Sequence, residues 1–385
     1  MDKTAQTVEA SDSAKVATRR KSQRSERQRQ GVVVQEICFF VEAARPSKNL
    51  HRRYAVANSK SNAVMYRLML LFVVACLTVV TGVAYAQVGF PPPPPKVSPI
   101  AGAIDMHIHP GPDIFVRSLT DTEMAMIAKR QGMRGIVLKN HVAPTADRAA
   151  LAMQQVPGIE VWGGVVLNNA VGGINPAAVE YMYRMEGGRG KVVWLPTFDS
   201  DMHIKTLVDK NQSGIVVAPN GKVTPATEEV LKIIARENLV LATGHIHPEE
   251  VVAVVKRARE LGVKNIIVTH AFTRIPGLTM AQAKDVAAMG AMIEICYQQF
   301  LAGPNSQFPW LRSWGQVDEK TVAMAVKEIG AKSLVLSTDL GAQDLPIPTD
   351  GLIAAVQAIK RQGVSDADID LMIRKNPARL LGLAD

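Results

Sequence analysis

The residues best suited to chemistry in this sequence lie at 105–109, which read Asp-Met-His-Ile-His. Apolar and polar residues alternate there, which is typical of a short strand, and a period of two places Asp105, His107 and His109 on one face. Two imidazoles at neighbouring positions of one face lie close enough to bind the same divalent cation. Because a proline and a glycine follow His109, we expect this pair at the C-terminal end of its strand.

Other polar residues that could do chemistry also follow apolar runs. They are Lys139 and His141, His245 and His247, His270, and Asp339. Histidines placed only for packing would not choose the ends of apolar runs so consistently. His203, which follows the fourth run, is interpreted as a loop residue, and Cys296 as a small core residue.

Eight apolar runs alternate with amphipathic helical segments between residue 100 and the C-terminus. The runs cover residues 103–108, 135–140, 161–167, 191–196, 239–244, 265–270, 291–296 and 333–338. This alternation predicts an α/β fold, a (β/α)8 TIM barrel over residues 100–385, with a closing helix within 367–383. A doubly wound open sheet lacks support, because no glycine-rich phosphate loop occurs. All strand C-termini of a barrel share one rim, so the polar residues above are expected to line one pocket.

The N-terminal part divides by composition. Residues 1–64 are basic and polar, and we expect a disordered tail or a gene start placed too early, since Met65 precedes an apolar run. Residues 65–86 are expected to be a signal peptide or a membrane anchor, because 68–86 carries no charge and ends in Ala-Tyr-Ala. Five consecutive prolines make 87–99 a stiff linker. The protein is therefore expected to be exported, to the periplasm or beyond the cell, or anchored to the membrane through 68–86.

Charge and cysteine content limit the partners. The formal net charge is +9, but residues 1–64 hold 13 Lys and Arg against 6 Asp and Glu, so the remaining chain is nearly neutral. We therefore expect a small-molecule substrate and no nucleic-acid partner. Cys296 is the one cysteine beyond residue 100, so the predicted barrel has no internal disulfide. The sequence leaves open whether the protein forms a homo-oligomer.

As a set, His107-x-His109, His245, His270 and Asp339 resemble the amidohydrolase superfamily of metal-dependent hydrolases, and within it a poorly characterised branch. The resemblance implies that His107, His109 and Asp339 hold a divalent cation and that His245 completes the site. It also implies that His270 either binds a second metal or hydrogen-bonds to the bound water.

The resemblance extends over about residues 100–385 and includes the closing Asn-Pro-Ala-Arg-Leu-Leu-Gly-Leu at 376–383. One departure lies after the fourth strand, where two-metal members carry a bridging Lys or Glu and this chain has neither. Asp199 or Lys139 could take that place, so one ion is favoured and two remain open. Zinc is the expected ion for His and Asp ligands, although manganese or iron would fit the same atoms.

The implied reaction is hydrolysis of an amide, lactone or other ester bond by a metal-activated water. The expected catalytic residues are Asp339 as the proton acceptor, His270, and Lys139, whose role is either catalytic or structural. The expected substrate-binding residues are Arg274, His141 and His247. The aromatic loop after the seventh strand, which contains Trp310 and Trp314, is either a substrate lid, or an oligomer contact or packed flap. A metal-dependent phosphoesterase and a non-catalytic exported ligand-binding barrel are the alternative functions.

Overall fold

The computed structural model describes residues 97–384 and, before them, Met69 and Leu71. The chain divides into two units, Met1–Pro93 and Pro94–Asp385, and the description below concerns the second. The predicted tail, the export segment apart from Met69 and Leu71, and most of the linker lie outside the described residues. No helix among the described residues is both long enough and apolar enough to cross a lipid bilayer.

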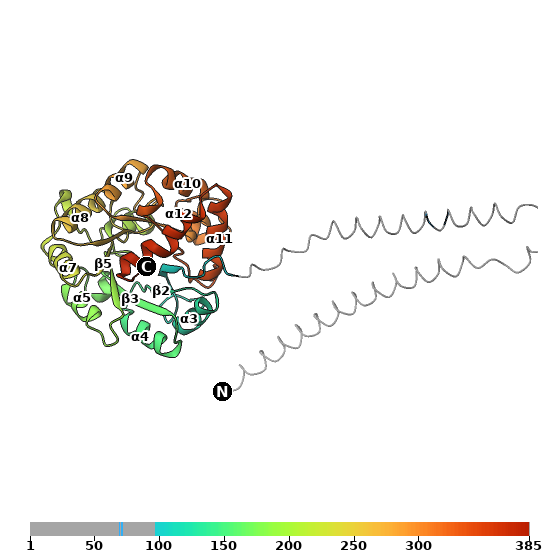
Figure 1. The fold of residues 1–385 in the computed structure, drawn as a ribbon. Helices are drawn as coiled ribbons and strands as arrows, with labels where there is room; N and C mark the ends of the chain where they lie inside the picture. The colour runs from blue at the N-terminus through green and yellow to red at the C-terminus, as the bar shows by residue number, and fades with distance from the viewer. Residues whose placement is uncertain (1–68, 70, 72–96, 385) are drawn as a thin grey trace, which may run out of the picture. The chain divides into compact units, whose positions relative to one another are not determined.

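Residues 97–384 contain eight parallel strands in one sheet, ordered as in the sequence, which confirms the predicted α/β barrel (Figure 1). The strands are β1 (Ile104–Ile108), β2 (Gly135–Leu138), β3 (Glu160–Val166), β4 (Gly190–Trp194), β5 (Val240–Ala242), β6 (Asn265–Val268), β7 (Met292–Cys296) and β8 (Leu334–Ser337). The barrel closes between β8 and β1 through two backbone hydrogen bonds of 2.8 Å, from Asp339 N to His107 O and from His109 N to Leu340 O. The first and last strands thus meet at the residues singled out for chemistry.

Helices follow the strands and surround the barrel in Figure 1. They are α3 (Asp121–Arg130), α4 (Ala146–Gln155), α5 (Pro176–Tyr183), α6 (Asp201–His203), α7 (Pro225–Arg236), α8 (Pro248–Glu260), α9 (Met280–Ala288), α10 (Glu319–Glu328), α11 (Pro348–Arg361), α12 (Asp366–Asp370) and α13 (Asn376–Leu381). Their starts follow from local chemistry. Thr120 and Glu123, for example, form a reciprocal capping box at α3, and Asp318 accepts a hydrogen bond from Thr321 N at α10.

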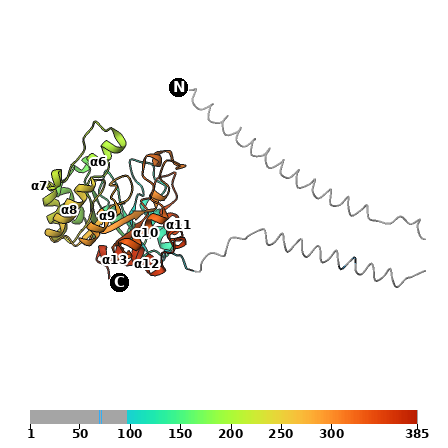
Figure 2. The ribbon, with the colours of Figure 1, turned by 90° about the horizontal axis from the view of Figure 1, so that it is seen from above.

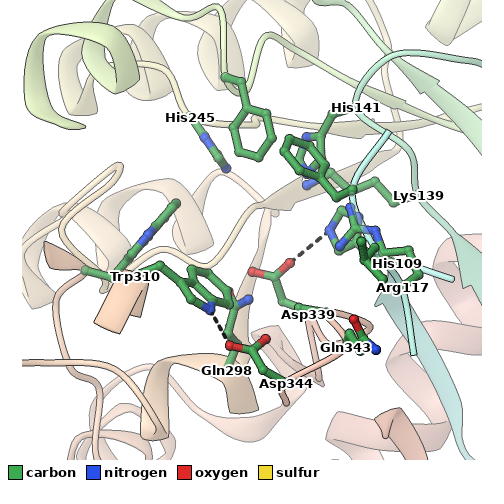
Figure 3. A pocket seen from close by; sticks show the side chains of 15 residues that line it. His109, Arg117, Lys139, His141, His245, Gln298, Trp310, Asp339, Gln343 and Asp344 are labelled. Atoms are coloured by element: carbon green, nitrogen blue, oxygen red, sulfur yellow. Dashed lines mark hydrogen bonds and ion pairs between the residues drawn. The ribbon is translucent and has the colours of Figure 1, made fainter. Parts of the chain in front are cut away.

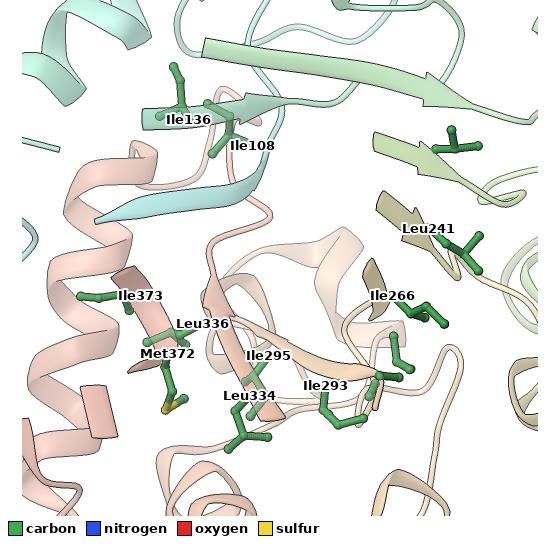
Figure 4. Packing of buried hydrophobic residues seen from close by; sticks show 14 of the residues in the cluster. Ile108, Ile136, Leu241, Ile266, Ile293, Ile295, Leu334, Leu336, Met372 and Ile373 are labelled. Carbon is green, nitrogen blue, oxygen red and sulfur yellow. The ribbon is translucent and has the colours of Figure 1, made fainter. Parts of the chain in front are cut away.

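The core has two layers. Between the strands and the helices, buried aliphatic side chains such as Ile136, Leu241 and Leu336 pack against the helical layer (Figure 4). Inside the barrel a second cluster contains Met106 and Trp194. This continuous burial on both faces explains why the strands appear in the sequence as nearly unbroken apolar runs.

The C-terminal segment closes one end of the barrel. The helix predicted within 367–383 consists of α12, a π-helix at Leu371–Lys375, and α13. Ala378, Leu380 and Leu381 of α13 pack on the interior cluster. The buried Asn376 donates hydrogen bonds from Nδ2 to the backbone oxygens of Ala331, just before β8, and of Leu334, the first residue of β8. Figure 2 shows α12 and α13 at one end of the barrel and α6 at the other.

Candidate metal centre

Three candidate ligands converge where β1 meets β8. The Nε2 atoms of His107 and His109 lie 2.9 and 3.1 Å from Oδ1 of Asp339. All three residues are buried, and one ligand atom from each lies within 4.8 Å of the other two. Such a set of two imidazoles and one carboxylate is suited to a divalent transition metal. The structure thus brings together the three residues that the resemblance implied as ligands.

The two remaining predicted ligands face each other at the ends of β5 and β6. The Nε2 atoms of His245 and His270 are 3.0 Å apart, and both rings are buried. Behind His245, its Nδ1 lies 3.0 Å from Nδ1 of His203 in α6. Ser200, the N-cap of α6, donates a hydrogen bond to the His245 carbonyl and accepts one from His203 N. His203 therefore contacts a site residue, whereas the sequence suggested an ordinary loop position.

Lys139 is the basic side chain that reaches this centre. Its Nζ is buried and lies 2.9 Å from His107 Nε2. Asp199, the other residue considered for the place of the missing bridging group, instead accepts a hydrogen bond from Asn169 N. Among the described residues, Lys139 is therefore the better placed of the two to contact a bound ion.

Glu294 on β7 is a site residue that sequence reasoning missed. Its Oε2 accepts hydrogen bonds from His107 Nδ1 at 3.1 Å and from the backbone N of His270 at 3.2 Å. The signal was present, since a period of two along β7 places Glu294 with Cys296, whose Sγ lies 3.8 Å from His107 Nδ1. A single acidic residue within an apolar strand did not stand out among the strand-end histidines.

Asp105, which the sequence placed on one face with His107 and His109, is not part of the candidate ligand group. The pairing of β1 with β2 shifts in register between Asp105 and Ile108. The Asp105 carboxylate accepts hydrogen bonds from the backbone N and hydroxyl of Thr338, at 3.1 and 2.6 Å. Asp105 therefore joins β1 to the end of β8, next to Asp339.

The charges of these buried groups suit a cation. Burial lowers the pKa of His107, but the carboxylates of Asp339 and Glu294 raise it, and the net result is about 9. Burial also lowers the pKa of His270 to about 4. For Asp339, burial opposes ionisation, yet His107 and His109 hold its pKa well below the usual range. Ionised carboxylates on either side of His107 require a positive charge there, which a proton or a metal ion can provide.

The hydrogen-bonding pattern gives a second test of whether a metal fits. Within the described residues, the buried Nδ1 atoms of His109 and His270 have no hydrogen-bond partner. Nε2 of His107 lies within 2.9 Å of both the Lys139 amine and the Asp339 carboxylate, and one nitrogen cannot donate to one and accept from the other at once. A cation among these atoms would resolve this conflict, so the residues fit a metal.

Local backbone geometry holds two of these side chains in place. His270 has φ of 29° and Asp339 has φ of 56°, conformations that residues other than glycine rarely adopt. After Asp339, Gly341 passes so close to β1 that a Cβ there would lie 2.1 Å from the carbonyl oxygen of His109. Left-handed backbone at ligand positions is typical of functional sites, where surrounding contacts maintain the strain.

A cavity of about 740 Å³ opens onto the centre, and Figure 3 shows the residues that line it. His141 lines this cavity and stacks on Phe198, with ring centroids 3.8 Å apart. Arg117, which sequence reasoning missed, also lines it. The predicted lid residues Trp310 and Trp314 form part of its wall.

The structure does not bring two predicted substrate-binding residues into the cavity lining. Arg274 is exposed and donates a hydrogen bond to Ser313 O, which is in the loop after β7. His247 caps α8 and pairs through Nε2 with Asp201 Oδ2 at 2.9 Å. Both side chains therefore make these contacts outside the cavity lining.

Comparison with known proteins gives a family and a set of similar folds. Residues 102–294 match a family described as "Family of unknown function (DUF6282)". No curated protein matches the sequence significantly. An organophosphorus hydrolase from Deinococcus radiodurans is 16% identical and has a TM-score of 0.48, with 74% of this chain and 94% of that chain covered.

Two further structures are described as a "Putative" and a "probable" 2-pyrone-4,6-dicarboxylic acid hydrolase. The one from Pseudomonas putida is 15% identical, covers 73% of this chain and 97% of its own, and has a TM-score of 0.49. The one from Acinetobacter baumannii is 14% identical and has a TM-score of 0.48, and the match covers 73% of the present chain and 100% of that chain. At this identity and score, the reaction of the present chain has to be inferred from its own side chains.

Proposed function

Since the chain belongs to the family of unknown function DUF6282, whose description names no reaction, we propose from the residues of its own site that it is a metal-dependent hydrolase. We further propose that it cleaves an amide, lactone or other ester bond of a small molecule. The observation that carries the proposal is the convergence of His107, His109 and Asp339, two of which, His109 and Asp339, line a cavity with aromatic walls. A purely structural cluster would not need to leave these groups beside a space that a small molecule can enter.

The residues of the site divide into proposed metal ligands and residues that orient those ligands. His107, His109 and Asp339 would hold one divalent ion, and His245 with His270 would complete the site or hold a second. The ion, when bound, supplies Lewis acidity and lowers the pKa of a coordinated water toward neutrality. Glu294 orients His107, and His203 orients His245, in each case through the ring nitrogen that faces away from the ion.

Asp339 is the proposed proton acceptor. Its Oδ1 is shared by the two imidazoles, while Oδ2 has no hydrogen-bond partner within the described residues and the side chain lines the cavity. Oδ2 would therefore take the proton of the attacking water and return it to the leaving group. The low pKa of Asp339 keeps this oxygen ionised at neutral pH.

The test compares Asp339→Asn with the unchanged protein, using elemental analysis for bound metal and a panel of aryl esters, lactones, anilides and aryl phosphates for activity. We expect hydrolysis of a carboxylic ester, lactone or amide by the unchanged protein, and at least about 100-fold less by Asp339→Asn with most of the metal retained. Turnover that survives in Asp339→Asn would refute the role of Asp339. Hydrolysis of the aryl phosphates alone would refute the proposed bond type.

A further inference from the structure

The cavity wall contains one guanidinium that the proposed chemistry does not use. Arg117 follows β1 in a loop that is bound to the loop after β8, where Ser118 N donates to Gly341 O at 2.9 Å and Gln343 N to Val116 O at 3.3 Å. These bonds connect the loop of Arg117 to the chain segment just after Asp339. The position of the Arg117 backbone relative to the metal centre is therefore fixed by these bonds.

One edge of this guanidinium is already occupied. Both Nε and Nη2 of Arg117 donate to Oδ2 of Asp113, at 2.8 and 2.6 Å. The Asp113 side chain is fully buried, and that of Arg117 is about 10% exposed. Asp113 thus holds the guanidinium in one orientation, and Nη1 has no hydrogen-bond partner within residues 97–384. The Nη1–Nη2 edge of Arg117 remains free to bind a second carboxylate end-on.

The other walls of the cavity indicate what kind of chemical group would carry that carboxylate. Aromatic rings of Phe115, Phe198 and Trp314 line the cavity, and Figure 3 shows Trp310 across the cavity from Arg117. Trp310 Nε1 donates to Asp344 Oδ2 at 2.9 Å, so an acidic group lies beside Trp310. A flat or apolar body with one anionic end would fit these walls in a single orientation.

We infer that the substrate of the proposed hydrolase carries a carboxylate, which binds the free edge of Arg117 while its apolar body lies against the aromatic wall. This inference rests on the proposed function. Lys139, the other cation of the cavity, is unsuited to this role because its Nζ is buried against His107 within the metal centre. Arg117 therefore selects the substrate, and the ligand set carries out the hydrolysis.

A binding experiment separates this inference from the chemistry. Full-length protein stripped of metal with a chelator, with its fold checked by circular dichroism, is titrated with benzoate and with the neutral benzamide. The test variant is Asp113→Asn/Arg117→Gln, which removes both charges and so leaves no unpaired buried carboxylate. The control is Arg274→Gln, which removes an exposed arginine outside the cavity.

We expect the double variant to bind benzoate about 10- to 100-fold more weakly with benzamide binding unchanged, since a charge-assisted bidentate contact is lost. Arg274→Gln is expected to bind both probes like the unchanged protein. In the metal-loaded enzyme, the same double variant should raise KM for the mono-4-nitrophenyl ester of glutaric acid but not for neutral 4-nitrophenyl pentanoate.

The binding experiment and the kinetic experiment distinguish the carboxylate site from the proposed function. Benzoate affinity that is equal in the double variant and the unchanged protein would overturn the inference, as would an equal loss in Arg274→Gln. Hydrolysis of both esters with no dependence on Arg117 would leave the proposed function standing and overturn the carboxylate site. Benzoate binding that depends on Arg117, without hydrolysis of any ester, lactone or amide, would support the site and refute the proposed function.

Discussion

Glu294→Gln tests whether the buried carboxylate behind His107 supports metal binding. Oε2 of Glu294 accepts both hydrogen bonds that the side chain makes, from His107 Nδ1 and His270 N, so a glutamine oxygen can take its place without a change of shape. The substitution removes the negative charge of Glu294. That charge makes His107 a stronger ligand and roughly doubles the strength of the hydrogen bond between the two side chains. Loss of such support costs about 10- to 100-fold in metal affinity, or about 1.4–2.7 kcal/mol.

The assay is competition for zinc with a chromogenic chelator, and Glu250→Gln is the matched control. Glu250 is equally buried, but its carboxylate accepts hydrogen bonds from Val217 N, Ala218 N and His247 N, outside the metal centre. The control should lower the free energy of unfolding by about 1–3 kcal/mol while zinc affinity stays unchanged. If Glu294→Gln bound zinc as tightly as the unchanged protein, the proposed support of His107 by Glu294 would be refuted.

Three further predictions concern stability. Removal of metal by a chelator should lower Tm by about 5–10 °C relative to protein with free metal at 100 times Kd, measured by scanning calorimetry; an unchanged Tm would argue against a specific site. Asn376→Ala should lower the free energy of unfolding in urea by about 2–4 kcal/mol, because two buried carbonyl oxygens lose their donor, and a loss below about 0.5 kcal/mol would contradict this. Although burial raises the pKa of Asp201, hydrogen bonds from Lys205 and His247 lower it below 3.8. The ionised Asp201 carboxylate therefore stabilises the fold above its unfolded pKa, and this contribution is lost as the pH falls through its folded pKa. Between about pH 5 and pH 3, the free energy of unfolding measured in denaturant titrations should fall less for Asp201→Asn than for the unchanged protein. An equal fall in the two proteins would contradict this.

The barrel and the positions of its main candidate ligands were predictable, because both depend on short-range patterns. Strands buried on two faces produce apolar runs, and a polar residue that ends such a run points into the shared rim of a barrel. The strand ends were less accurate, since β5 and β6 stop two residues before the ends of their predicted runs. At β6 the run ended in His270, whose left-handed backbone cannot continue a strand.

The supporting residues could not be predicted, because their positions depend on long-range contacts. His203 reaches His245 only through the path of α6, and nothing in its local sequence distinguishes it from a surface histidine. Arg117 and Arg274 both lie in loops after strands, and the sequence suggested Arg274 for the substrate. Arg117 lines the cavity, and the backbone hydrogen bonds that hold its loop join it to the loop after β8, more than 200 residues further along the chain.

The left-handed backbone at Asp339 also decides which substitutions the fold tolerates there. Most side chains would add conformational strain at φ of 56°, whereas asparagine and glycine adopt this region readily. Asparagine is also the residue closest in shape to aspartate, so the change that removes the proposed proton acceptor is the one that the backbone accepts most easily. Asp339→Asn should therefore fold like the unchanged protein and retain an uncleaved substrate in the cavity. A crystal of this variant soaked with extracts of small molecules would then identify the natural substrate directly, without a prior choice of candidate compounds.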